Sequence, residues 1–160
     1  MALGKAWPDW VALVLAGIAV VGGLSLLIGA SAPRWPSGWL ERDRGPLRLL
    51  PGDSQQRYRR LGAVWLKSFL PEAGALFGGK TKKRLPRLDD RAAVEGYLRE
   101  VRRGEWVHWL SDLTWLPLVL FQPWGLALVF AILTLTVNGA AIVVLRYNRV
   151  RLYGVLADLT

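Results

Sequence analysis

The sequence predicts an all-α integral membrane protein, a single membrane domain over residues 1–160 with about three transmembrane helices and a basic amphipathic middle region. Hydrophobic residues make up 52% of the chain and the mean hydropathy is +0.26, which is high for a soluble domain of this length. Two stretches, 10–33 and 113–145, contain no charged residue. The segment 32–105, by contrast, holds 17 Lys and Arg against 9 Asp and Glu.

The first transmembrane helix is predicted at residues 10–30. The uncharged run 10–33 would extend about 36 Å as a helix, enough to cross the roughly 30 Å hydrocarbon layer. Tryptophans lie at both of its ends, as interfacial anchors do: Trp7 and Trp10 at the start, Trp35 and Trp39 just after the end. A cleaved signal peptide is the alternative, because Ala30-Ser31-Ala32 resembles a cleavage site. Pro33 would follow that cut and the amino-terminal charge is weak, so we favour a retained helix.

The second uncharged run predicts a helical hairpin. As one straight helix, 113–145 would be about 50 Å long, which exceeds a single membrane span. Gln122-Pro123-Trp124-Gly125 interrupts it with a turn signal. We therefore expect a short transmembrane or re-entrant arm at 105–121, kinked by Pro117, and a returning transmembrane helix at 124–145.

Residues 31–104 are predicted to form a basic cytoplasmic or interfacial region. Within it, Ser54–Leu70 spaces apolar residues as an amphipathic helix that lies on a membrane surface, with Tyr58, Leu61, Trp65 and Phe69 on one face. An ordinary helix packed on its neighbours is the alternative. The stretch 71–86 reads as irregular and basic.

A further helix should begin at a capping Asp89 or Asp90, bury a face from Ala93 to Val101, and run on into the first arm of the hairpin. Glu95 and Arg99 are spaced to form an ion pair on it. Since basic residues favour the cytoplasmic side, the middle region and a cytoplasmic tail at 146–160 predict a multi-pass protein of a bacterial-type cytoplasmic membrane. The amino terminus and the turn at 122–125 would lie outside.

Several function classes are excluded by what the chain contains. There is no cysteine and one histidine, so cysteine-ligated and multi-histidine metal sites are ruled out. No nucleic-acid-binding motif accompanies the net charge of +9. Residues 74–81 match the P-loop pattern, but Pro71 precedes them where a strand is needed and no parallel sheet fits the remaining chain. We predict a solvated basic loop near lipid phosphates there, and contact with a phosphorylated donor is the alternative.

The candidate chemistry lies where the charged region meets the apolar hairpin. Glu105 and His108 are three residues apart and would share a helix face, where a carboxylate could orient the imidazole as a general base. Asp112 could join that face. Asn138 should lie at a similar depth on the returning helix and could hydrogen-bond His108 or a substrate carbonyl. The alternatives are a histidine that lies in the lipid headgroup region without a catalytic role, and an asparagine that only stabilises helix–helix packing.

These residues together resemble the glycosyl-4,4'-diaponeurosporenoate acyltransferase family, the staphyloxanthin-type carotenoid acyltransferases. The resemblance covers roughly 60–160 and is weaker upstream, at Trp65, Lys67, Pro71, Arg102 and Arg103. Val150 and Gly139 stand where the family pattern has proline. The resemblance is carried by Glu105, His108, Trp109, Ser111, Pro117, Asn138 and the run Arg146-Tyr147-Asn148-Arg149-Val150-Arg151-Leu152.

The resemblance implies an O-acyltransferase that moves a fatty acyl group from a thioester to a sugar hydroxyl of a glycosylated carotenoid. His108 would take the hydroxyl proton and Glu105 would hold the imidazole. Substrate and oxyanion contacts would come from Asn138, Asn148, Arg146, Arg149, Arg151, Lys67, Arg103 and Trp109. The donor would be acyl-CoA or acyl carrier protein, with no tightly bound cofactor.

The expected partners are membrane lipids, the lipidic acceptor and the thioester donor, with no nucleic acid; a homo-oligomer is left open. A non-catalytic membrane scaffold and an acyltransferase for another lipid acceptor are the alternatives.

Overall fold

The computed structural model describes residues 6–69 and 88–159, and this part of the chain contains helices and turns but no strand. Five α-helices form it: α1 (Ala6–Ser31), α2 (Gln55–Arg60), α3 (Ala63–Phe69), α4 (Arg91–Ser111) and α5 (Trp124–Asp158). Short 3-10 turns lie at η1 (Ala32–Arg34), η2 (Ser37–Trp39), η3 (Gly45–Leu47) and η5 (Leu116–Leu120). The P-loop-like segment 74–81 and the whole stretch 71–86 predicted to be irregular lie outside the described residues.

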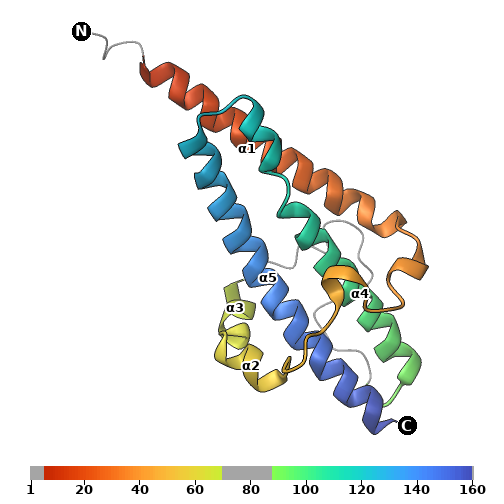
Figure 1. The fold of residues 1–160 in the computed structure, drawn as a ribbon. Coiled ribbons are helices and arrows are strands. Elements are labelled where there is room, and N and C mark those ends of the chain that lie inside the picture. The colour runs from red at the N-terminus through yellow and green to blue at the C-terminus, as the bar shows by residue number, and fades with distance from the viewer. Residues whose placement is uncertain (1–5, 70–87, 160) are drawn as a thin grey trace.

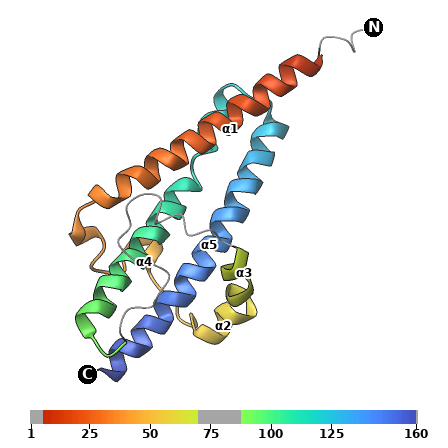
Figure 2. The ribbon, with the colours of Figure 1, turned by 180° about the vertical axis from the view of Figure 1, so that it is seen from behind.

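The scaffold is the antiparallel pair of α4 and α5, with α1 crossing its end (Figure 1). Seen from behind, α2 and α3 lie against α5 (Figure 2). Two apolar clusters form the core, the first between α4 and α5 and the second between α5, η5 and α1. One, near the carboxyl end of α5, joins Val94, Leu98, Val101 and Leu152. The other joins Leu118, Ala127 and Phe130 and receives α1 through Val20 and Val21.

The long helix predicted from the apolar face at 93–101 is present and runs on toward the hairpin. Asp90 caps α4 by accepting a hydrogen bond from the backbone N–H of Ala93 at 3.2 Å. The expected face is buried at Val94, Leu98 and Val101. The ion pair of Glu95 is formed with Arg91 at 3.0 Å, one turn before it, rather than with Arg99.

The hairpin differs from the prediction in its first arm. Regular α-helix ends at Ser111, and the remainder of 105–121 is a turn followed by η5, where Pro117 lacks the N–H that a continuing α-helix would need. In the described residues, two helices, α1 and α5, are long and apolar enough to cross a membrane. The short transmembrane or re-entrant arm expected at 105–121 stays a prediction.

The amphipathic helix predicted over Ser54–Leu70 is two helices. Gly62 adopts a φ of +81°, a left-handed conformation that ends α2, and α3 starts directly after it. The predicted apolar face is consequently divided, because Tyr58 is buried while Leu61 and Trp65 are exposed. The prediction of one continuous helix over this segment is therefore wrong.

The outward faces of α1 and α5 are apolar, as is typical of helices that contact lipid. The apolar part of α5, residues 124–145, would extend about 33 Å, close to the thickness of a hydrocarbon layer. The helix then continues past Arg146, Arg149 and Arg151 without interruption, so the predicted tail is largely helical. Exposed large apolar side chains include Val11, Leu15, Ile18 and Leu27 on α1, and Leu128, Ile132, Leu133 and Val137 on α5.

A glycine lets α1 approach α5 closely. A Cβ at Gly17 would stand 2.5 Å from the Phe130 ring and 2.8 Å from Nε2 of Gln122. Gln122 also donates a hydrogen bond to the carbonyl of Leu13 at 2.8 Å. The amino-terminal half of α1 is therefore held beside the turn at 122–123.

Replacing Gly17 with leucine is expected to lower the free energy of unfolding by about 1–3 kcal/mol, because the added side chain overpacks this contact. The matched control is Gly22→Leu on the same helix, where an added Cβ meets nothing within 4 Å. Thermal unfolding in detergent micelles measures both. Equal melting temperatures for the two variants would contradict the close approach of α1 to α5.

Candidate active site

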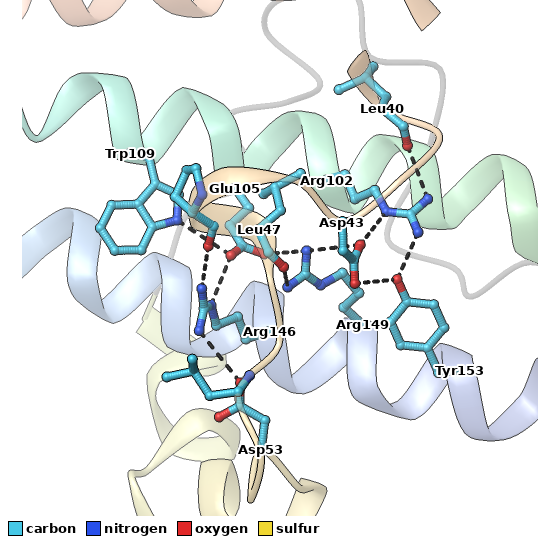
Figure 3. A network of polar contacts seen from close by, with 12 residues as sticks. Leu40, Asp43, Leu47, Asp53, Arg102, Glu105, Trp109, Arg146, Arg149 and Tyr153 are labelled. Carbon is cyan, nitrogen blue, oxygen red and sulfur yellow. Dashed lines mark hydrogen bonds and ion pairs between the residues drawn. The ribbon is translucent and has the colours of Figure 1, made fainter. Parts of the chain in front are cut away.

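Between the two apolar clusters, the α4–α5 interface becomes polar. Glu105 on α4 is completely buried and so is Arg149 on α5. The carboxylate of Glu105 accepts a hydrogen bond from Nε of Arg146 at 2.9 Å and lies 3.3 Å from Nη1 of Arg149 (Figure 3). A buried carboxylate thus faces two guanidinium groups, which come from the Arg-rich run after the apolar part of α5.

A segment from before α2 completes this network. Residues 40–53, here named the strap, cross α4 and α5 (Figure 3). Asp43 lies 2.8 Å from Nε of Arg102 and 3.5 Å from Nη1 of Arg149. Asp53 lies 3.6 Å from Nη1 of Arg146. Backbone carbonyls of the strap also accept hydrogen bonds, at Leu40 from Arg102, at Pro46 from Arg146 and at Leu47 from Arg149.

The charges of the network balance. Three carboxylates, Glu105, Asp43 and Asp53, face three enclosed guanidinium groups, Arg102, Arg146 and Arg149. Asp53 also pairs with Arg57, whose side chain is exposed. Buried charges are tolerated when they are paired and hydrogen-bonded. The network therefore joins α4, α5 and the strap in one arrangement, and its arginines are already occupied by protein groups.

The predicted pairing of Glu105 with His108 is not formed. Glu105 is bound to Arg146 and Arg149, which outcompete a neutral imidazole because their charge is permanent. Nδ1 of His108 instead lies 2.8 Å from Oδ1 of Asn138. The predicted contact between His108 and Asn138 is therefore confirmed, and it rests on the matched depth of the two residues on antiparallel helices.

The surroundings of Asn138 fix the tautomer of His108. Asn138 is buried, and its Nδ2 donates a hydrogen bond to the carbonyl of Thr134 at 3.0 Å. Because a carbonyl only accepts, that atom is the amide nitrogen, and the oxygen must be the atom that faces His108. Nδ1 then carries the hydrogen, and the lone pair of the neutral ring is on Nε2. Nε2 has no hydrogen-bond partner within residues 6–69 and 88–159.

The family model for glycosyl-4,4'-diaponeurosporenoate acyltransferase matches residues 36–158. The chain belongs to this family. The match contains the whole network and both members of the His108–Asn138 pair, and it starts after α1. No curated protein and no solved structure matches the chain.

Of the other residues predicted for the site of this acyltransferase, Trp109 contacts the network and the rest do not. The indole N–H of Trp109 donates to Glu105 at 3.4 Å, and its ring lies 5.9 Å from the Arg146 guanidinium. Arg103 is half-buried and pairs with Glu100. Lys67 is exposed on α3, and two half-buried residues of α5, Asn148 and Arg151, stand outside the network in Figure 3.

The sequence did not assign four residues of the network to the site. Asp43 and Asp53 belong to the basic middle region, Arg102 entered only through the family resemblance, and Tyr153 looks like an ordinary helix position. The Tyr153 hydroxyl donates to Asp43 at 2.7 Å and accepts from Arg102 at 2.7 Å. The one available signal was the presence of isolated carboxylates among the arginines of 41–60.

The acyltransferase network extends to α2 through Tyr58. Its hydroxyl lies near Arg146 and Asp53, and burial raises the pKa of Tyr58 above its ordinary value, although Arg146 acts in the opposite direction. Tyr58 is therefore neutral at physiological pH. In the described part of the chain, no three His, Cys, Asp or Glu side chains are grouped to hold a metal ion.

Proposed function

We propose that this acyltransferase is membrane-bound and transfers a fatty acyl group from a thioester donor to a sugar hydroxyl of a glycosylated carotenoid. The observation that carries the proposal is the hydrogen bond between His108 and Asn138. It leaves the lone pair of Nε2 free to act as a base, on a histidine in the last turn of α4. A hydroxyl needs such a base to become a strong nucleophile.

The proposed step balances as follows. Nε2 of His108 removes the proton of the sugar hydroxyl while that oxygen attacks the thioester carbonyl carbon. The tetrahedral intermediate collapses as the carbon–sulfur bond breaks, and the imidazolium returns its proton to the leaving thiolate. The products are an ester and a free thiol, with His108 neutral again. Asn138 acts as a positioning residue, because it holds the ring in the required tautomer.

The remaining predicted binding residues receive narrower roles. Arg146 and Arg149 are occupied by buried carboxylates, so we assign them to holding the fold of the site. Lys67, Arg151 and Asn148 are the groups proposed to meet the phosphates of acyl-CoA or acyl carrier protein, or the oxyanion. Arg103 is the weaker choice because Glu100 already pairs with it. The donor is proposed as a substrate, with no tightly bound cofactor.

The proposed setting is a bacterial-type cytoplasmic membrane, with the lipidic acceptor arriving from the bilayer and the thioester from the cytoplasm. The amino-terminal half of α1 and the turn at 122–123 lie at one end of the molecule. The arginines of α2 and those at the end of α5 lie away from that end. This separation supports an outside amino terminus and a cytoplasmic basic region.

The test is mass spectrometry of lipid extracts from a host that supplies the glycosyl carotenoid, with and without this protein. We expect an acylated glycosyl carotenoid only where the protein is present. With purified protein in nanodiscs, the same product should require added acyl-CoA or acyl carrier protein thioester.

Two results would contradict this proposal and favour an alternative. A new acylated lipid other than the carotenoid would assign the chemistry to a different acceptor. No new acylated lipid, together with copurification in a larger complex, would favour the membrane scaffold.

A further inference from the structure

Asp112 is a buried carboxylate that the network of Figure 3 does not include. It caps the carboxyl end of α4, its side chain is enclosed with the residue 7% exposed, and its Oδ1 has no hydrogen-bond partner. Its backbone N–H donates to the carbonyl of His108 at 3.0 Å, so it stands one helical turn after that residue. The carboxylate is in hydrogen-bonding contact with the Asn138 side chain and within electrostatic range of His108.

An ionised Asp112 at this position lowers the stability of the fold, so its presence there calls for another explanation. A negative charge at the carboxyl end of a helix opposes the helix dipole, and a buried carboxylate without a cation costs free energy. Of the buried carboxylates in residues 6–69 and 88–159, Asp112 is the one without an ion pair. Glu105, one turn before His108, is already neutralised by two arginines.

We propose that Asp112 is the charge partner of His108, which stabilises the imidazolium formed when Nε2 takes the hydroxyl proton. This rests on the proposed function. No proton moves to Asp112; its fixed negative charge favours the cationic ring through the protein interior, where charges are weakly screened. The two residues act on His108 in different ways. Asn138 sets the tautomer of the ring, and Asp112 sets the balance of charge around it.

No other charged group on the helices around His108 is placed to serve as its charge partner. On α4, the neighbouring Glu105 is paired, and on α5 no charged residue occurs between Trp124 and Arg146. On α1, none occurs between Trp10 and Pro33. On α3, which packs against α5, Lys67 has an exposed side chain.

The chain contains one histidine, so its imidazole can be observed directly by NMR. Full-length protein labelled with ¹⁵N-histidine and carrying a histidine-free tag would be titrated in detergent micelles. Asp112→Asn should move the titration midpoint of the ring to lower pH by about one unit, because an opposite charge nearby is lost. Asp112→Glu keeps the charge and should restore most of the shift. Asp158→Asn, exposed at the far end of α5, is the matched control and should leave the midpoint in place.

The acidic limb of the rate profile for acyl transfer should move with the NMR midpoint, and the rate of Asp112→Asn should fall about tenfold, which is the equivalent of one unit. An unchanged midpoint in Asp112→Asn would overturn the inference, even with a lower rate, because it would indicate a structural role only. If wild type transfers no acyl group while the midpoint still moves, the charge pairing stands and the proposed reaction fails.

Discussion

His108→Ala is expected to lower the rate of acyl transfer by about 10²–10⁴-fold, which is the usual contribution of a positioned general base. The variant removes Nε2 and leaves the sugar hydroxyl protonated, so the attacking oxygen stays a weak nucleophile. Since the change affects the chemical step, kcat should fall while the KM for the acceptor changes little. Product formation by purified protein in nanodiscs, followed by mass spectrometry, measures both.

The matched control for this variant is Thr136→Val on α5. Thr136 is exposed two residues before Asn138, and its hydroxyl bonds only to the carbonyl of its own helix, at Ile132. It should keep the wild-type rate. Both proteins should melt near the wild-type temperature, which separates chemistry from folding. A His108→Ala protein that is folded and retains the wild-type rate would remove the histidine from the mechanism.

Glu105→Gln is expected to lower the free energy of unfolding by about 3–5 kcal/mol, because it leaves Arg146 and Arg149 as buried cations without their shared carboxylate. The cost is large because both arginines are enclosed and neither can turn to water. Thermal and denaturant unfolding in detergent would measure the loss. The strap should also become accessible to protease, since Arg146 and Arg149 hold its carbonyl groups at Pro46 and Leu47.

Glu95→Gln on the same helix is the matched control. Its ion pair with Arg91 is about half exposed on both sides, at 55% and 50%, and exposed pairs contribute less than about 1 kcal/mol. If Glu105 instead oriented His108, as the spacing of the two residues suggests, Glu105→Gln would melt like Glu95→Gln and lose only activity. The melting temperature therefore distinguishes the two roles of Glu105.

Sequence signals predicted structure reliably where they depend on residues within a single helix. The uncharged run at 10–33 and the capping Asp90 each act within a few residues, and both helices are present. The signals were weaker where a backbone conformation competes with a periodic pattern. Gly62 divides the segment 54–70 because a positive φ ends a helix whatever face the side chains form. Similarly, Pro117 prevents the first arm from continuing as an α-helix.

The sequence by itself determined the helical class, the family, and the residues His108 and Asn138, since equal distances from a turn place residues at equal depth on an antiparallel hairpin. Only the tertiary structure decided which carboxylate serves which cation. Spacing on one helix brings Glu105 near His108, but the folded chain adds Arg146 and Arg149 from α5 and Asp43 from the strap. Permanent charges in a buried site are satisfied first. Glu105 is therefore bound to the arginines, and Asp112, one helical turn after His108, is the buried carboxylate of the described residues left without an ion pair.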